Sequence, residues 1–180
     1  FGFNALAPMA ATRPIPAEVP EEGRLEKGPA FEEETGEFVP GINDWPTYRH
    51  DASRSGTSYA EIPSQVQEKW QCHLGGRLTS PVIAGGLVYV SQIDAHTLYA
   101  LDEANGETRW TYTAGGRIDS PPSVQDGRVL FGGTDGWVYC LRANDGALQW
   151  RYRAAPLDRR TMAYEQLESL WPVHGSVLIH

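Results

Sequence analysis

A pattern of glycine and tryptophan residues recurs along this chain with a period of 40 residues. Residues 98–110 and 138–150 each join an alternating apolar run to an Asn-Gly or Asp-Gly pair and then to a tryptophan. Both pairs favour the positive φ values of a tight hairpin turn. Short strands and turns repeated at this period are typical of propeller blades. We therefore expect an all-β fold, a β-propeller of four-stranded antiparallel blades.

The repeat also divides the chain into two regions. Residues 12–41 are rich in Pro and Glu and poor in large apolar side chains, so they bury too little surface to offset the entropy of ordering. We expect residues 1–43 to form an extended acidic linker or tail. The remainder is expected to be a partial propeller: a lead-in and closing strand at 44–75, blades at 78–114 and 118–154, and the start of a further blade at 155–180.

Alternating apolar residues predict four strands in each complete blade. These are 79–84, 87–92, 97–102 and 107–114 in the first blade, and 120–125, 128–133, 137–142 and 147–154 in the second. A lone strand at 66–74 is expected to close the last blade of the ring. Residues 155–170 interrupt the period as a polar connection with room for a helical turn, and 171–179 resemble the first two strands of a third blade. Known propellers close with at least four blades, so the ring needs more blades, from further sequence or from a second polypeptide.

Charge and composition exclude two classes of partner. The formal net charge is -8, and eight acidic residues against two basic ones fall within residues 18–37. A chain without a basic surface is a poor nucleic-acid binder, and no apolar run reaches the roughly 20 residues of a membrane span. Two readings remain for Cys72 and Cys140: small buried apolar residues, or a disulfide between blades.

The lead-in, residues 44–56, mixes aromatic, charged and turn-forming residues. Its large aromatics, Trp45 and Tyr48, are expected to pack against the rim of the propeller. His50 beside Asp51 suggests acid–base chemistry. Adjacent residues on an extended segment face opposite ways, so we expect the two side chains not to act together.

Residues 100–110 resemble the tryptophan-docking repeat of quinoprotein-type propellers, A-x-D-x-x-T-G-x-x-x-W, with Asn105 in the place of Thr. The second copy is looser, with Cys140, Arg142 and Asp145 at the Ala, Asp and Thr positions. Residues 44–49 also resemble the lead-in to the first blade of such proteins. The resemblance covers about 44–180 and implies a periplasmic or extracellular protein. It implies that each tryptophan fastens neighbouring blades, in a docking pattern made of Trp70, Trp110, Trp150, Gly106 and Gly146.

Two kinds of function follow from this resemblance. The family contains dehydrogenases that use pyrroloquinoline quinone and Ca²⁺, and non-enzymatic assembly lipoproteins of the outer membrane. The vicinal Cys-Cys pair of the larger dehydrogenases is missing from this chain. We therefore expect a binding or scaffold module, whose partners are the remainder of the propeller and other proteins. One alternative is a dehydrogenase dependent on pyrroloquinoline quinone, whose cofactor-binding blades lie partly outside this chain. The other is a purely structural module.

In this family the loops from an outer strand to the next inner strand lie on one face, around the mouth of the central channel. Arg77 and Arg117 occupy equivalent positions in these loops. The hypothesis is a pocket in which arginines bind an anionic group, a carboxylate holds a cation or polar ligand, and a tryptophan stacks on a planar ligand. The alternative is ordinary turn chemistry with solvated side chains. The candidates are Arg77, Arg117, Asp119, Arg159, Arg160, Glu168 and Trp137; no catalytic residue is predicted.

Overall fold

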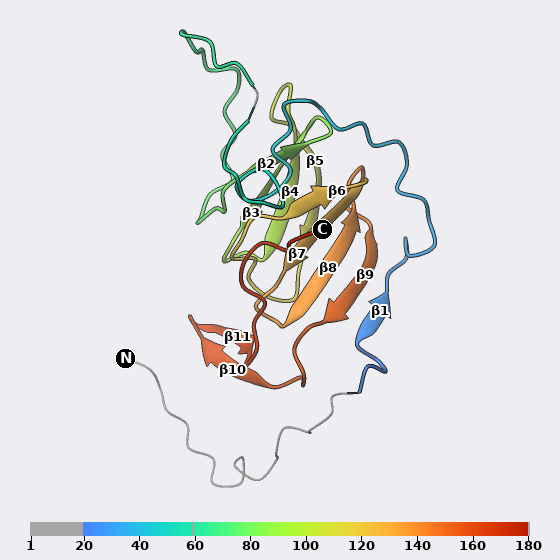
Figure 1. The fold of residues 1–180 in the computed structure, drawn as a ribbon. Helices are drawn as coiled ribbons and strands as arrows, with labels where there is room; N and C mark the ends of the chain where they lie inside the picture. The colour runs from blue at the N-terminus through green and yellow to red at the C-terminus, as the bar shows by residue number, and fades with distance from the viewer. Residues whose placement is uncertain (1–19, 59, 180) are drawn as a thin grey trace.

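The computed structural model describes residues 20–58 and 60–179, and within them it is built of β-strands without a helix. Two antiparallel sheets form consecutive blades (Figure 1). The first blade has the order β2-β3-β4-β5, with bounds Val82–Ala84, Leu87–Gln92, Thr97–Asp102 and Thr108–Thr113. The second continues as β6-β7-β8-β9, with bounds Ser123–Gln125, Arg128–Gly132, Trp137–Arg142 and Leu148–Arg153. The all-β propeller prediction is confirmed, and the eight strands end within three residues of their expected limits.

The two copies of the sequence repeat fold in the same way. Gly106 and Gly146 have φ values of 75° and 74°, and each donates its amide to a carbonyl four residues back, over 2.8 Å to Asp102 and 2.9 Å to Arg142. The ladder shifts register at the same place in both blades, after Ala100 and Cys140. Positive φ at the turn glycine is what the Asn-Gly and Asp-Gly pairs supply.

Tryptophans join each repeat to the next. The indole nitrogen of Trp110 donates to the carbonyl of Ala143 over 2.9 Å, and Trp70 donates to Glu103 over the same distance. In each case the acceptor lies 33 residues further along the chain. A Cβ atom on Gly146 would lie 2.5 Å from the Trp110 ring, so the indole lies directly against the turn glycine of the following blade.

The main core fills the space between the two blades. From the first blade it takes Tyr89 and Leu98, and from the second Phe131 and Tyr139, all at most 1% exposed. The rings of Phe131 and Tyr139 stack with centroids 5.1 Å apart, and Tyr112 meets both edge-on. Burial of these aromatic surfaces is the main source of cohesion between the blades. Cys72 and Cys140 are free thiols, and burial raises the pKa of Cys140 to about 11.

An added strand lies on the outer edge of the second blade. β1 (Leu25–Lys27) pairs antiparallel with β9, giving that sheet five strands. We call residues 20–38, which lie along this blade, the strap. Figure 1 shows the strap in blue beside β9. Ala30 is buried and donates its amide to Leu148 over 3.0 Å. A low content of apolar side chains does not exclude these contacts, because unpaired backbone groups on β9 offer hydrogen bonds to any extended segment.

Three local expectations at the ends of the propeller were wrong. Residues 66–74 form no strand in the described structure, although Trp70 takes its docking position. Residues 171–179 likewise form no strand. Instead of a helical turn, the polar connection forms a hairpin of β10 (Arg160–Ala163) and β11 (Gln166–Ser169). Its two turn residues, Tyr164 and Glu165, have φ values of 50° and 62°, as a two-residue hairpin turn requires.

Candidate functional site at the mouth of the blades

The β10–β11 hairpin crosses the mouth loops of both blades. Toward the first blade, the Gln166 side chain contacts the His96 ring nitrogen over 2.6 Å and donates to the Asp94 carbonyl over 3.2 Å. Toward the second blade, the Ser169 amide donates to the Thr134 carbonyl over 2.8 Å. The hairpin therefore ties together loops that lie about 40 residues apart in the sequence.

Arg117 forms the centre of this contact. Its Nε donates to Glu168 Oε1 over 2.6 Å, and each of these side chains is 5% exposed. A second carboxylate, Asp119, lies 3.3 Å from the Arg117 NH1 atom and also contacts His174 over 3.0 Å. The guanidinium packs 4.5 Å from the centre of the Tyr164 ring. Burial opposes the charge, but the hydrogen bond to Glu168 and the nearby carboxylates raise the pKa of Arg117 overall, so the guanidinium stays charged.

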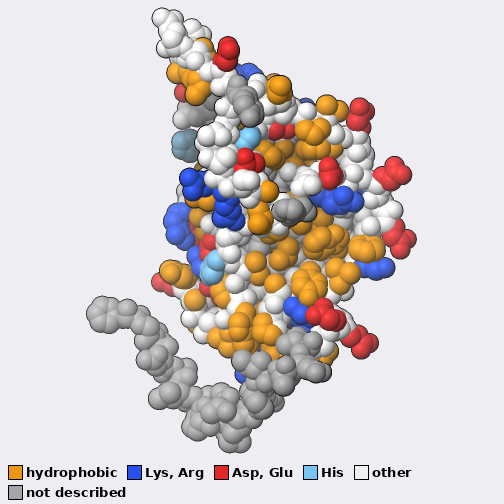
Figure 2. All heavy atoms as spheres, in the orientation of Figure 1, with side chains coloured by type: hydrophobic (Ala, Val, Ile, Leu, Met, Phe, Trp, Pro, Cys, Tyr) orange, Lys and Arg blue, Asp and Glu red, His pale blue; other side chains and the backbone are white. Residues whose placement is uncertain are grey.

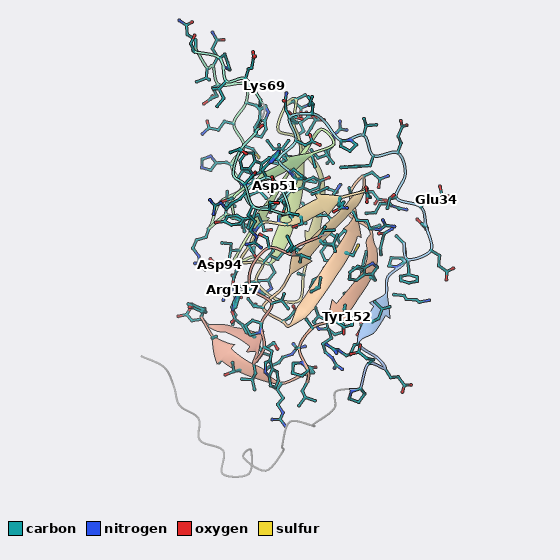
Figure 3. All side chains as sticks on the ribbon, viewed as in Figure 1. Glu34, Asp51, Lys69, Asp94, Arg117 and Tyr152 are labelled. Carbon is teal, nitrogen blue, oxygen red and sulfur yellow. The ribbon has the colours of Figure 1, made fainter. Side chains whose placement is uncertain are left out.

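Arg77, the equivalent residue of the preceding repeat, forms a different kind of contact. Its guanidinium donates twice to Asp94, over 2.9 and 2.7 Å, but its side chain is 61% exposed. The hydrogen bond from Arg77 holds the pKa of Asp94 below its usual value. Arg77 and Asp94 border an open hollow of about 540 Å³ that is completed by the hairpin residues 164–166. Figure 3 shows Asp94 and Arg117 on the same side of the blades, next to the hairpin.

The remaining candidates lie apart from Arg117. Arg160, at the start of β10, donates to Asp158 over 3.0 Å, and the backbone of Arg159 accepts the Leu170 amide over 2.9 Å. Trp137 begins β8, where its ring packs against the core and carries the Arg151 guanidinium 4.5 Å from its centre. The structure thus brings together three of the candidates: Arg117, Asp119 and Glu168. Arg77 borders the adjoining hollow. Trp137 stacks with an arginine of its own blade.

Sequence reasoning missed several residues of this cluster. Tyr164 and Gln166 belong to a hairpin that the broken period concealed, and His174 follows it in a segment expected to be a strand. The Tyr-Glu pair between two alternating runs, 160–163 and 166–169, was the available signal. It is weak because neither residue is Gly or Asn, the usual sign of a turn with positive φ.

The carboxyl of Asp135 is buried close to the mouth loops. Asp135 Oδ2 accepts a 2.5 Å hydrogen bond from the Tyr139 hydroxyl, which in turn accepts the Gly115 amide over 3.1 Å. A Cβ atom on any of three surrounding glycines would come within 2.6 Å of Asp135; these are Gly115, Gly116 and Gly133. Burial raises the pKa of Asp135, although its hydrogen bonds act in the opposite direction. Asp135 is only 6% exposed, so its carboxyl is enclosed by the surrounding structure.

The donor set at the mouth does not suit a quinone with calcium. A quinone bearing carboxylates needs cationic partners, but Arg117 and Arg77 are already paired with Glu168 and Asp94. Residues 20–58 and 60–179 contain no group of three His, Cys, Asp or Glu side chains arranged to hold a metal ion.

Comparisons with known proteins place this geometry in a family. Residues 48–171 match the family model described as outer membrane protein assembly factor BamB. The protein of that name from Yersinia pestis is 31% identical over 94 residues, 52% of this chain and 23% of the relative; the one from Burkholderia pseudomallei is 31% identical over 99 residues, 54% of this chain and 26% of the relative. The chain thus spans about a quarter of the length of the curated relatives it matches.

Among solved structures, quinohemoprotein alcohol dehydrogenase ADHIIG from Pseudomonas putida HK5 is similar to this chain with a TM-score of 0.57 and 18% identity. The match covers 77% of this chain and 22% of the dehydrogenase. At that identity the likeness concerns the propeller fold. No helix in the described part of the chain is long and apolar enough to cross a membrane. Because the family model matches well over half of its residues, the chain belongs to the family described as outer membrane protein assembly factor BamB.

Proposed function

We propose that this propeller is a non-enzymatic, exported protein-binding module that acts as a scaffold within a larger protein or assembly. Membership of a family named for outer membrane protein assembly supports a role with protein partners. The remainder of the ring, together with at least one further protein, would be those partners. The observation that carries the proposal is the orientation of the β10–β11 hairpin.

Toward its turn, the hairpin has polar side chains against the propeller and an apolar pair in solvent. Glu168 and Gln166, which bond to the mouth loops, pair with Thr161 and Ala163 on one face. On the opposite face the cross-strand pair of Met162 and Leu167 is 74% and 54% exposed. Residues on one strand alternate between faces, so the sequence fixes this arrangement. Figure 2 shows hydrophobic side chains gathered at the lower end of the molecule, over the hairpin.

Such an orientation reverses the usual rule for a surface hairpin, which buries its apolar face. Tyr164 at the turn is also 77% exposed and Leu170 49% exposed, so the apolar surface continues beyond the pair. Both outer edges of this two-stranded sheet lack a neighbouring strand among the described residues. An exposed apolar face beside an unpaired edge is what a protein partner recognises, through side-chain burial and strand addition.

We further propose that Arg117 and Glu168 hold this hairpin over the mouth rather than bind a free ligand. The support is that each satisfies the other in a buried contact. Asp119 and Tyr164 occupy the remaining sides of the guanidinium. The fixed hairpin then presents its apolar face at one angle, which lowers the ordering cost of binding.

The test is recovery of partners by the full-length protein. After chemical crosslinking in its native cells, the Met162→Ser, Leu167→Ser double variant should recover its principal protein partner at least about tenfold less well, as expected for loss of a central apolar contact. The matched control is Ile62→Ser with Val66→Ser, two residues that are 85% and 76% exposed away from the hairpin. Equal recovery by the hairpin variant and the wild type would refute the proposal.

A further inference from the structure

A second concave site lies at the opposite end of the inner strands from the mouth. It is a cavity of about 410 Å³ between the lead-in, the ends of β2 and β6, and residues 178–179. That volume is in the range of small-molecule sites. Figure 3 shows Asp51, which lines it, beside the inner strands and away from the hairpin. Its position separates it from the contacts of Arg117 described above.

The lead-in forms one wall of this cavity and is attached by hydrogen bonds to both blades. Trp45 exchanges two backbone hydrogen bonds with Ile83 of β2, over 2.8 and 2.9 Å. One residue later, the Pro46 carbonyl accepts the Val124 amide of β6 over 2.8 Å. The Thr47 hydroxyl then lies 2.7 Å from the Ser123 hydroxyl. The wall is thus attached at three successive residues and does not depend on a mobile loop.

Slightly further along the lead-in, Arg49 and His50 have an unusual backbone. Arg49 and His50 have φ values of 60° and 80°, a left-handed conformation that costs non-glycine residues roughly 1–3 kcal/mol each and is concentrated at functional sites. Because of this turn, the expectation that His50 and Asp51 face apart was wrong: His50 Nδ1 and Asp51 Oδ2 lie 3.5 Å apart. His50 Nδ1 is buried and has no hydrogen-bond partner in the described structure. The His50 ring lines the cavity 5.1 Å from the Trp45 ring.

The lining of the cavity combines a broad apolar surface with negatively charged hydrogen-bond acceptors. Among its residues are three carboxylates, Asp44, Asp51 and Asp126, and no Lys or Arg. Asp51 already accepts the Ser55 amide and hydroxyl over 2.9 and 2.6 Å. The hydrogen bonds of Asp44 are likewise structural, since its carboxylate accepts the backbone amides of Gly41 and Gly85. Among the described residues, Asp126 receives only a 3.4 Å hydrogen bond from Gln125, so of the three carboxylates it has the greatest remaining capacity to accept hydrogen bonds.

The apolar wall consists of side chains from four separate segments. It is formed by Phe38, Pro40, Ile42, Pro46, Ala84, Val124, Leu178 and Ile179. We propose that this cavity binds a small molecule with an apolar body and a protonated amine, the amine meeting Asp126 and the body lying along the apolar wall. An anionic ligand would face three carboxylates without a cationic partner, so charge selects the amine. This inference does not depend on the protein-binding role of the hairpin.

The test uses the full-length protein with n-hexylamine as the probe, measured by calorimetry and by Trp fluorescence. Hexylamine should bind at least about tenfold more tightly than n-hexanol and n-hexanoate of equal chain length. Asp126→Asn should reduce hexylamine affinity about tenfold and leave hexanol binding unchanged. Asn tolerates the φ of 49° at this position, so the variant should fold normally.

Ala52→Trp provides an independent variant, because it fills the cavity from an exposed position of its lining. It should abolish binding of hexylamine and hexanol while leaving the thermal unfolding temperature unchanged. Glu165→Gln, which removes a carboxylate at the mouth hollow, is the matched control and should bind hexylamine as the wild type does. Equal affinity for hexylamine and hexanoate, absence of hexylamine binding, or unchanged binding in Ala52→Trp would each overturn the proposal.

Discussion

The two blades share one repeat but differ at their outer edges. In the first blade the edge of β5 has no neighbouring strand in the described chain, whereas β1 covers the equivalent edge of β9. The difference follows from side chains that the repeat leaves free to vary. Arg151 of β9 donates to Glu26 of the strap over 2.7 Å, and its equivalent one repeat earlier is Thr111. The two blades therefore offer the same kind of strand edge, and charged positions such as Arg151 distinguish the edge that the strap occupies.

The equivalent arginines in the mouth loops of the two repeats also differ in their contacts, and the expected difference in stability is larger there. Arg117→Met should destabilise the hairpin by about 3 kcal/mol, because it leaves the carboxylate of Glu168 buried without its partner. Arg77→Met removes an exposed pair at the equivalent position and should leave stability nearly unchanged. Hydrogen exchange of the amides of residues 160–169 is the measurement. Equal protection in the two variants would show that burial does not distinguish the two arginines.

The turn glycines offer a comparison within the blades. Gly146→Ala should cost roughly 3 kcal/mol, because it combines a positive φ with a Cβ atom 2.5 Å from the Trp110 ring. Gly86→Ala has a similar φ of 76° but nothing within 4 Å of the new atom, so only the backbone strain of about 1 kcal/mol should remain. Chemical denaturation of both variants measures the difference. A cost for Gly86→Ala as large as that for Gly146→Ala would remove tryptophan packing from the explanation.

The strap can be released without altering β9 itself. A Cβ atom on Gly28 would lie 2.1 Å from the Leu148 carbonyl oxygen, so Gly28→Ala should detach the strap there and cost about 2 kcal/mol in lost pairing. The β9 amides should then exchange as rapidly as those at the free edge of β5. Gly23→Ala is the control for a change in the same segment: the new atom meets nothing within 4 Å, so only the backbone strain of its φ of 76° should appear. Unaltered exchange at β9 in Gly28→Ala would show that the edge is protected by another contact.

The sequence repeat predicted the fold, but it did not predict most of the contacts in the site. Strand alternation, turn glycines and tryptophan spacing are local signals, so the blades were predictable within three residues at their ends. The strap was not, because its hydrogen bonds come from the backbone and its ion pair joins residues 125 positions apart. The buried Arg117 pair was equally hidden: Glu168 was named as a candidate, but only the hairpin brings it to Arg117. Local periodicity does not encode contacts that depend on an insertion folding back across the repeat.

The final comparison concerns the carboxyl beneath the mouth, since Asp135 of the second blade corresponds to Ala95 of the first. Burial raises the pKa of Asp135 in the folded protein, whereas an unfolded Asp titrates near about 3.9. The folded state therefore retains this proton over a pH range in which the unfolded state has lost it. The stabilisation is complete below the unfolded pKa and declines as pH rises through the folded pKa. Asp135→Asn keeps the hydrogen-bonding shape without the titration, so the free energy of unfolding of the wild type should fall relative to that of the variant as pH rises above about 4. Denaturation of both proteins at a series of pH values measures this difference, and parallel curves would show that the proton on Asp135 makes no contribution to the stability of the second blade.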